Sequence, residues 1–231
     1  MTKNIKMLIR RAASVLCLGG MLLSAGLFTS CTEKDNTVEE FTNWQSKNET
    51  YWNKLYTATQ QKIKSGDTSW KIILNYTFQN QKQTSGSALT YSPEDYIIAH
   101  VEQAGAGTAS PLYSDSVSMH YMGRLIPSTT YTSGLIFDKS WSNDTFNATT
   151  SRPAHRFIGL TYSSEGKAVS LVDGFTTALM SMHRGDHWIV YIPYQLGYGA
   201  SASGMVPAYS TLIFDLRLVD FSHPGTKLKD S

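Results

Sequence analysis

The spacing of apolar residues changes along this chain and divides it into segments. Residues 12–28 form an almost continuous apolar run, which has the length of a secretory signal core or a marginal membrane span. From residue 38 to 64 the apolar side chains recur at loosely helical spacing. After residue 69, short runs rich in β-branched and aromatic residues predict strands. The pattern therefore predicts an export signal, a helix and a largely β domain.

The segment from 38 to 64 has helix signals at both of its ends. Thr37 and Glu40 have the spacing of a capping box, in which the two side chains bind free amides of the first turn. The last turn is basic, and Gly66 suits the position just after the helix. A helix of this length would span roughly 40 Å, so we expect a break near residues 47–49. We expect its aromatic residues to pack against the following domain.

Five later segments resemble β-strands, and one resembles a short amphipathic helix. The helix is predicted over Val172–Met182, where Asp173 favours the N-terminus and Gly185 ends it. The predicted strands are 69–78, 96–101, 117–123, 187–193 and 211–221. Strands with one helix inserted late favour an α+β fold, in which an antiparallel sheet curls around that helix.

The N-terminus has the features of a bacterial lipoprotein signal. Basic residues precede the apolar run, and small residues lead to the cysteine in Leu27-Phe-Thr-Ser-Cys31. This motif resembles a lipobox, which implies that residues 1–30 are removed and that Cys31 is lipidated. Its acyl chains would anchor the protein in a membrane, because each buried methylene contributes about 0.8 kcal/mol. Residues 31–37 would be a polar tether, whose acids resemble those of Bacteroidetes-type surface lipoproteins. The alternative is an ordinary cleaved signal with a chance cysteine.

The export signal changes the meaning of the charge and cysteine counts. The full chain has 20 basic and 18 acidic residues. Without residues 1–30, which hold four basic residues and no acidic ones, 16 basic and 18 acidic residues remain, a net charge of −2. This charge does not favour nucleic acid as a partner. Both cysteines, Cys17 and Cys31, belong to the signal, so the mature domain has no thiol for a disulfide, catalysis or a metal.

Motifs for nucleophilic or nucleotide chemistry are missing from the sequence. It has no Gly-x-Ser-x-Gly elbow, no P-loop and no dinucleotide fingerprint. His183 and His187 have the spacing of two metal ligands on a helix. However, Gly185 lies between them and predicts a turn, which favours two structural histidines over a metal site. We therefore expect neither a metal nor a cofactor.

Five short blocks follow one another between residues 117 and 221. They are Val117–Leu125, Phe137-Asp138, Leu171–Phe175, Ile192–Gly199 and Val206–Asp215. In this order they resemble the FKBP-type peptidyl-prolyl isomerases over roughly residues 96–221. The resemblance implies a half-barrel of five or six antiparallel strands that wraps one short helix and forms a pocket for a proline side chain. After the signal and tether, the chain would then consist of an N-terminal extension of helix and strand (38–93), the isomerase domain (94–222) and a tail (223–231).

The resemblance also implies two sets of pocket residues. Those that would act on the substrate amide, as apolar walls or hydrogen-bonding groups, are Tyr121, Phe137, Asp138, Tyr198 and Phe214. Those that would bind the substrate around that amide are Leu171, Val172, Phe175 and Val206. In this scheme the Asp138 carboxylate accepts hydrogen bonds at the pocket edge. The Val172 amide and the Tyr198 hydroxyl bind the substrate backbone.

Three features of this pocket depart from the usual pattern of the family. Phe175 stands where tryptophan is common, the loop 199–204 lacks long side chains, and the segment 127–135 is longer than usual. Each of them falls at the pocket or its mouth. We expect them to change substrate preference and macrolide affinity rather than the fold.

Proline isomerisation suits a chain that has aromatic residues and no nucleophile. The barrier comes from amide resonance, roughly 18–20 kcal/mol, and an apolar, water-poor pocket favours the twisted and less polar amide. The expected function is an envelope-anchored peptidyl-prolyl cis-trans isomerase. Its partners would be proline-containing, unfolded or partly folded exported polypeptides, with macrolides as candidate inhibitors. The alternative is a non-catalytic proline-peptide-binding or chaperone module.

Overall fold

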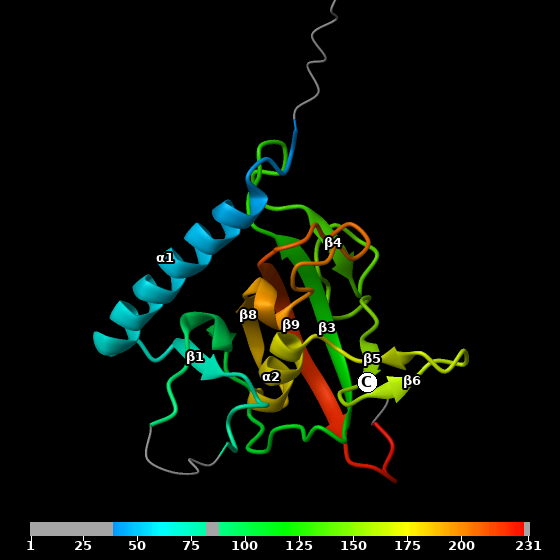
Figure 1. Cartoon of the computed structure of the whole chain (residues 1–231). Helices are drawn as coiled ribbons and strands as arrows, with labels where there is room; N and C mark the ends of the chain where they lie inside the picture. The colour runs from blue at the N-terminus through cyan, green and yellow to red at the C-terminus, as the bar shows by residue number, and fades with distance from the viewer. Residues whose placement is uncertain (1–38, 82–87, 229–231) are drawn as a thin grey trace, which may run out of the picture. The chain divides into compact units, whose positions relative to one another are not determined.

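A seven-stranded antiparallel sheet organises the residues that the structure, a computed structural model, describes, namely 39–81 and 88–228. The strand order is β1-β2-β8-β9-β3-β4, and β5 also pairs with β3 (Figure 1). The strands of this sheet are β1 (Trp70–Leu74), β2 (Tyr96–Gln103), β3 (Ser116–Leu125), β4 (Ile136–Lys139), β5 (Ala154–Phe157), β8 (His187–Ile192) and β9 (Leu212–Ser222). The architecture confirms the predicted α+β fold with an antiparallel sheet.

Two helices and a small hairpin complete the fold. The helices are α1 (Trp44–Lys64) and α2 (Asp173–Ser181). Two short segments each form one turn of 3₁₀ helix, η1 (Pro93–Asp95) and η2 (Tyr194–Leu196). The hairpin, β6 (Thr161–Tyr162) with β7 (Ala168–Val169), lies between β5 and α2 in the chain. The sequence pattern did not predict it, because strands of two residues are too short to show an alternation.

Helix α2 packs on one face of the sheet through a continuous apolar core. Its buried residues Ala178 and Leu179 belong to the same cluster as Val190 of β8 and Leu216 of β9. Gly174 allows the helix to approach β8, because a Cβ atom there would lie 2.3 Å from a methyl carbon of Ile192. Each fully buried leucine or valine contributes about 1.5–3 kcal/mol relative to an exposed one. This burial fixes the start of α2 against the central strands.

Helix α1 packs on the opposite face of the sheet. The face can be identified because successive side chains of a strand point to opposite sides. Ile97 of β2 belongs to the core under α2, so its neighbour Tyr96 points to the other face. The ring of Tyr56 in α1 lies 6.0 Å from that of Tyr96. The Lys62 ammonium lies 3.7 Å from the ring centre of Trp70, which pairs with His100 on this same face of β2. The helix therefore does not cover the face that carries α2.

The start of α1 differs from the sequence prediction. The helix begins at Trp44, after a turn in which Asn43 has a left-handed φ of 53°. The N-cap is therefore Asn43 and not the predicted Thr37, which lies outside the described residues. The carboxylate of Glu40 binds a distant segment, where it accepts hydrogen bonds from the Ser128 hydroxyl and the Thr130 amide. A residue predicted to cap the helix thus makes a long-range interaction.

The predicted break in this helix is also wrong. Helix α1 continues through residues 47–49, where Asn48 is buried and its side-chain amide donates to the Trp44 carbonyl. The predicted end is confirmed. The Gly66 amide donates to the Ile63 carbonyl and the Asp67 amide to the Lys62 carbonyl, each at 3.0 Å, and Gly66 has a φ of 93°. These bonds form a Schellman motif, which glycine favours at this position.

Two other elements end earlier than predicted. The strand expected to reach Phe78 ends at Leu74, because the chain then turns and the Phe78 amide donates to the Asn75 carbonyl at 2.9 Å. Helix α2 ends at Ser181, and Gly185 lies in the turn before β8 instead of directly after the helix. The predicted signal and tether, residues 1–37, lie outside the described residues. Among the residues described, no helix has the length and apolar character needed to span a bilayer.

Candidate active site

Four aromatic rings from four different elements meet on the α2 face of the sheet. Phe214 of β9 is central, with its ring centre 4.8 Å from that of Phe175 in α2 and 5.6 Å from that of Phe137 in β4. Tyr121 of β3 lies 6.1 Å from Phe175 and 6.4 Å from Phe214. All four contacts are edge-to-face, the arrangement that the charge distribution of aromatic rings favours.

A glycine makes this arrangement possible. Gly123 pairs with both Phe214 of β9 and Asp138 of β4 in the sheet. A Cβ atom at this position would lie 2.5 Å from the Phe137 ring and 2.7 Å from the Phe214 ring. Any larger residue would push the two rings apart. The glycine in the block Val117–Leu125 therefore has a packing role in the pocket.

The polar edge of the cluster is a hydrogen bond between two predicted site residues. The Tyr121 hydroxyl donates to Oδ2 of Asp138 at 2.8 Å. Burial raises the pKa of Tyr121 to about 12, the Asp138 carboxylate adds to this rise, and Arg156 opposes it. The phenol therefore stays protonated near neutral pH. Its proton is directed at Asp138, and this bond orients the carboxylate at the edge of the aromatic rings.

The start of α2 places two apolar side chains and a backbone donor beside the rings. Leu171 and Val172 precede the helix, and the Val172 carbonyl accepts hydrogen bonds from the Phe175 and Thr176 amides. Within residues 39–81 and 88–228, the Val172 amide donates to no protein acceptor. The adjacent helix N-terminus adds a small positive potential. This amide is thus available to a carbonyl group of a ligand.

The loop between η2 and β9 contributes one side chain from above the rings. Tyr198 is 40% exposed and lies at the edge of the cavity. Val206, in the same loop, is buried with only 3% exposure and belongs to the main core. Among the nine predicted pocket residues, Val206 is the one that does not line the cavity. It supports the loop from below.

These residues line an open cavity of about 170 Å³. The volume is below the roughly 300–1,000 Å³ of sites for drug-sized ligands and suits a single small side chain. The cavity is lined by eight predicted residues, Tyr121, Phe137, Asp138, Leu171, Val172, Phe175, Tyr198 and Phe214, and by three others, Met119, Arg156 and Ser170.

Two of the three unpredicted residues show what sequence reasoning could find. Met119 lies two positions before Tyr121 on β3, so strand alternation alone places it on the same face. Arg156 of β5 pairs with Val117 of β3, and its guanidinium donates to the His155 carbonyl at 2.9 Å. No apolar or catalytic pattern marked this arginine. Only the pairing of β5 with β3 places it at the cavity.

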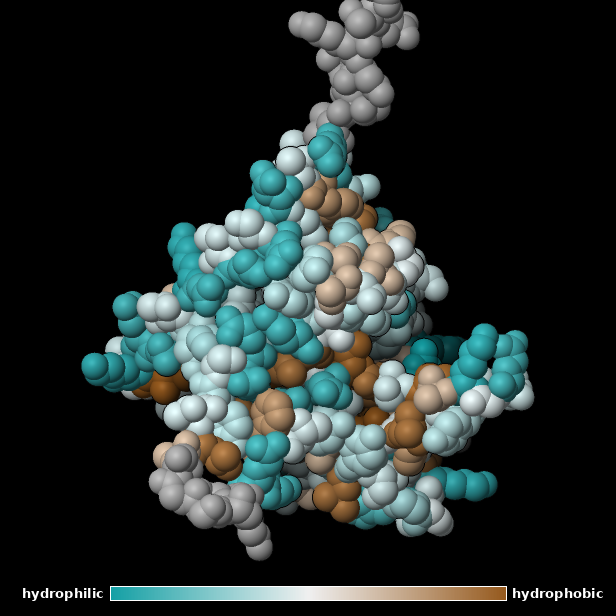
Figure 2. Space-filling view, viewed as in Figure 1, coloured by the Kyte–Doolittle hydropathy of each residue, from teal (hydrophilic) through white to brown (hydrophobic). Residues whose placement is uncertain are grey.

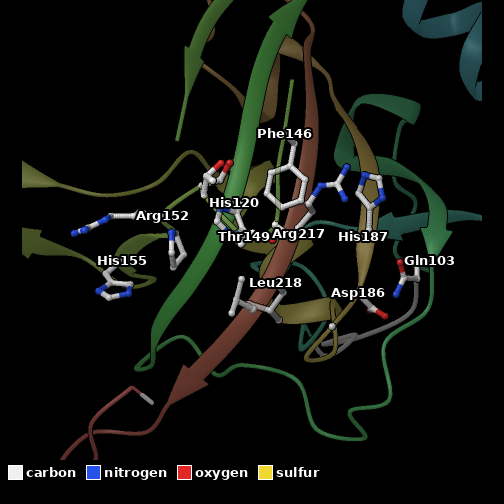
Figure 3. A pocket seen from close by; sticks show the side chains of 16 residues that line it. Gln103, His120, Phe146, Thr149, Arg152, His155, Asp186, His187, Arg217 and Leu218 are labelled. Carbon is white, nitrogen blue, oxygen red and sulfur yellow. The ribbon is translucent and has the colours of Figure 1, made fainter. Parts of the chain in front are cut away.

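A larger hollow, about 1170 Å³, lies elsewhere and contains none of the predicted pocket residues. Figure 3 shows His120, Phe146 and Arg217 beside one another there, with His187 on the neighbouring strand. The Arg217 guanidinium lies 4.3 Å from the Phe146 ring centre and pairs with Asp215. His187 Nε2 lies 2.9 Å from Asp215 Oδ1. The two groups form an ion pair when the histidine is protonated, although the angle is poor for a hydrogen bond. The Arg217 and His187 side chains of this hollow therefore already have a protein partner in Asp215.

The two histidines with metal-like spacing do not share a helix. His183 follows α2, whereas His187 begins β8. His183 Nδ1 lies 3.6 Å from Asp186, and His187 is paired with Asp215. Their positions fit structural roles in a turn and a strand. Across the residues that the structure describes, no group of three or more candidate ligand side chains is close enough to hold a metal ion.

Comparisons with known proteins find one family. The family described as FKBP-type peptidyl-prolyl cis-trans isomerase matches residues 107–219. The macrophage infectivity potentiator of Trypanosoma cruzi is 31% identical over 149 residues, 64% of this chain and 63% of that protein. FK506-binding protein 1A of Neurospora crassa is 31% identical over 132 residues, 57% of this chain and 92% of that protein. This chain thus spans less than two thirds of the Trypanosoma relative. The crystal structure of FkpA from Escherichia coli aligns with a TM-score of 0.49 and 21% identity, covering 79% of this chain and 63% of that one.

Proposed function

This chain belongs to the FKBP-type peptidyl-prolyl cis-trans isomerase family, and on that basis we propose that it accelerates cis-trans isomerisation of Xaa-Pro bonds in exported polypeptides. The observation that carries the proposal is the aromatic cavity with polar groups at its edge. The proline ring of a substrate would enter between Tyr121, Phe175 and Phe214. The amide before the proline would then lie at the cavity edge.

The apolar lining accounts for the rate acceleration. Resonance makes the planar amide polar, and water stabilises that polarity by hydrogen bonds to the carbonyl. Twisting the bond costs roughly 18–20 kcal/mol and removes the resonance. Phe175 and Phe214 are only 5% and 6% exposed, so a bound amide would exchange water for aromatic surface. This exchange raises the free energy of the planar state more than that of the twisted state.

The polar edge orients the substrate. The Val172 amide can donate to a substrate carbonyl, and the exposed Tyr198 hydroxyl can bind the peptide backbone. Asp138, held by Tyr121, offers an acceptor beside the amide that twists. No proton is transferred and no bond is broken, so these groups need only to remain in place. Macrolides are the expected inhibitors.

The surface around the cavity suits an unfolded polypeptide. Leu160, Tyr162 and Val169, in and beside the hairpin, are 46%, 68% and 51% exposed. The chain passes directly from β7 to Ser170 and Leu171, which line the cavity. Figure 2 shows apolar surface in the middle of this face that continues toward the hairpin. Apolar residues that flank a proline in a non-native chain would contact this surface.

The cell envelope is the proposed place of action. The sequence Leu27-Phe-Thr-Ser-Cys31 supports lipidation of Cys31 after removal of residues 1–30. The pocket would then be tethered outside the cytoplasm through the short polar segment before α1. Exported chains that fold there contain Xaa-Pro bonds, whose uncatalysed isomerisation takes tens to hundreds of seconds. An anchored isomerase would shorten this step.

A protease-coupled assay on a short Xaa-Pro peptide tests the proposed activity. The wild-type protein should accelerate isomerisation, and Phe214→Tyr should reduce kcat/KM, because a hydroxyl in the apolar cavity lacks a partner and attracts water. Phe146→Tyr, in the larger hollow, is the control and should retain wild-type activity. Absence of acceleration by the wild-type protein would reject the enzyme. If the protein then still suppressed aggregation of an unfolded chain, the alternative binding or chaperone module would replace it.

A further inference from the structure

The helix that precedes the family-matched region contacts the loop that completes the cavity. The match begins at residue 107, whereas α1 ends at Lys64. The loop between η2 and β9 carries Tyr198 at the cavity edge and the buried Val206. Its two ends both reach α1, although that helix lies on the other face of the sheet.

The C-terminal end of the loop is held by two buried hydrogen bonds from α1. The Trp44 indole donates to the Ser210 hydroxyl at 2.8 Å. The Thr211 amide donates to Oδ1 of Asn48 at 2.7 Å. Trp44 and Asn48 are one helical turn apart, and Asn48 is itself oriented by its bond to the Trp44 carbonyl. The two side chains therefore form one preorganised anchor.

The anchor reaches toward the cavity through a chain of hydrogen bonds. Ser210 accepts from Trp44 and donates its own proton to the Pro207 carbonyl at 2.6 Å. Pro207 directly follows Val206. Because each bond of such a chain polarises the next, the bonds strengthen one another. Loss of the indole donor would weaken the support of the Val206–Pro207 backbone.

The 3₁₀ turn η2, which leads into the loop, has a weaker link to the same helix. The Tyr194 hydroxyl lies 3.4 Å from Oε1 of Glu49, and the Tyr194 ring packs edge-to-face on that of Tyr209 at 5.2 Å. Tyr209 has a left-handed φ of 62°, which is uncommon for a residue other than glycine. Its amide donates to the Gly199 carbonyl at 2.9 Å, which closes the loop next to Tyr198.

We propose that Trp44 and Asn48 of α1 are positioning residues for the isomerase, which hold the loop that presents Tyr198 to the substrate. The inference rests on the proposed function for its catalytic consequence. The N-terminal helix then belongs to the catalytic unit, and is more than a spacer between a membrane anchor and an independent domain. The two side chains touch no substrate and act through the loop alone.

A matched pair of tryptophan variants tests this role. Trp44→Phe keeps an aromatic ring but removes the donor to Ser210. Trp52→Phe, two turns later in α1, removes a similar bond from the indole to the Pro93 carbonyl, 3.2 Å long, which lies outside the loop. Trp44→Phe should lower kcat/KM for a short Xaa-Pro peptide by about fivefold or more, equivalent to about 1 kcal/mol. Trp52→Phe should change it less than twofold.

Amide hydrogen exchange separates positioning from a general loss of stability. In Trp44→Phe the Gly199 and Tyr209 amides, which both close the loop, should exchange faster, whereas amides of central β8 should not. Trp52→Phe should leave the loop amides unchanged. Ser210→Ala should have an effect at least as large as Trp44→Phe, because it removes the same bond and also the bond to the Pro207 carbonyl. Adding Trp44→Phe to Ser210→Ala should cause no further loss.

Two results would overturn the proposal. Equal loop exchange in Trp44→Phe and Trp52→Phe would show that Trp44 does not hold the loop. Faster loop exchange with unchanged kcat/KM would show that the loop does not need to be held for catalysis. A wild-type protein without isomerase activity would reject the proposed function instead. The exchange measurements would still decide whether α1 holds the loop.

Discussion

Tyr121 and Asp138 connect the aromatic wall of the pocket to its polar edge. The hydroxyl of one donates to the carboxylate of the other at 2.8 Å, and the two residues lie on adjacent strands. Each would be unremarkable alone, since a tyrosine on an inward strand position is usually a core residue. Their pairing beside Phe175 and Phe214 makes the cavity a plausible site for an amide.

Asp138→Asn should lower kcat/KM for a short Xaa-Pro peptide by about tenfold. A hydrogen bond to a charged acceptor contributes about 1.5–3 kcal/mol, compared with about 0.5–1.5 kcal/mol for a neutral one, and about 1.4 kcal/mol corresponds to a factor of ten in rate. Asp144→Asn, at an exposed loop position, is the matched control. Equal activity of the two variants would remove Asp138 from the site.

The raised pKa of Tyr121 predicts the pH dependence of stability. The folded protein keeps the phenolic proton up to about pH 12, whereas the unfolded chain releases it near the ordinary pKa of 10.0. The folded state therefore binds more protons in this range, so stability should fall as pH rises from 10 to 12. Urea midpoints measured across this range should fall less steeply in Tyr121→Phe. Tyr51, whose pKa burial also raises to about 12, preserves part of the slope. An unchanged slope would contradict the prediction.

Gly123→Ala should damage both the pocket and the fold. The added methyl group would overlap the Phe137 and Phe214 rings, at 2.5 and 2.7 Å. Overpacking of this kind costs about 1–3 kcal/mol, which urea unfolding would measure. Because the rings that must move line the cavity, kcat/KM should fall as well. Wild-type stability and activity in this variant would show that the rings are not held where the structure places them.

At the scale of elements, features that depend on neighbouring residues were predicted, whereas features that depend on long-range contacts were not. The apolar stripe of α2 and the glycine end of α1 depend on neighbouring residues, and both helices were predicted. The start of α1 was not, because Glu40 binds the distant Ser128 and Thr130 instead of the helix. Similarly, Arg156 reaches the cavity only through the pairing of β5 with β3.

The hairpin between β5 and α2 should matter for protein substrates more than for short peptides. Its exposed Tyr162 and Val169 side chains lie in the segment that leads into the cavity. Replacing both with serine should slow the catalysed refolding of a proline-limited protein severalfold, and change the rate for a tetrapeptide less than twofold, because a tetrapeptide has few residues beyond its proline that could reach the hairpin.

Ile63→Ser is the control for the hairpin variant. Ile63 is also an exposed apolar residue, at 39%, but it lies in α1, which packs on the other face of the sheet. It should affect neither substrate. If the hairpin variant and the control behaved alike, or if both substrates slowed equally in the hairpin variant, the hairpin would have no specific role in binding proteins.

At the scale of the whole molecule, the N-terminal extension and the family-matched region share one sheet. Strand β1 pairs along its full length with β2, from Trp70 opposite His100 to Leu74 opposite Tyr96. Strand β2 in turn pairs with β8, which lies inside the matched region. The sequence predicted these strands but could not show their pairing, since nothing local to a strand specifies a distant partner. The same applies to α1, whose contacts with the loop before β9 join residues more than 160 positions apart.

Cys31→Ser should release the protein from membranes. Lipidation requires the thiol, and several acyl chains give durable anchoring, whereas a cleaved signal alone gives none. Fractionation of cells that express the full chain would place the wild-type protein in the membrane pellet and Cys31→Ser in the soluble fraction. A mature wild-type protein that is already soluble would favour the ordinary signal with a chance cysteine.

The most direct test of the proposed activity is exchange NMR on a peptide with a single Xaa-Pro bond, in the presence of a small amount of the protein. The account predicts exchange peaks between the cis and trans forms at mixing times where the free peptide shows none, because uncatalysed exchange takes tens of seconds or longer. In the same titration, ring signals of Tyr121, Phe175 and Phe214 should shift. Shifted ring signals without accelerated exchange would contradict the account, since the pocket would then bind proline without catalysing its isomerisation.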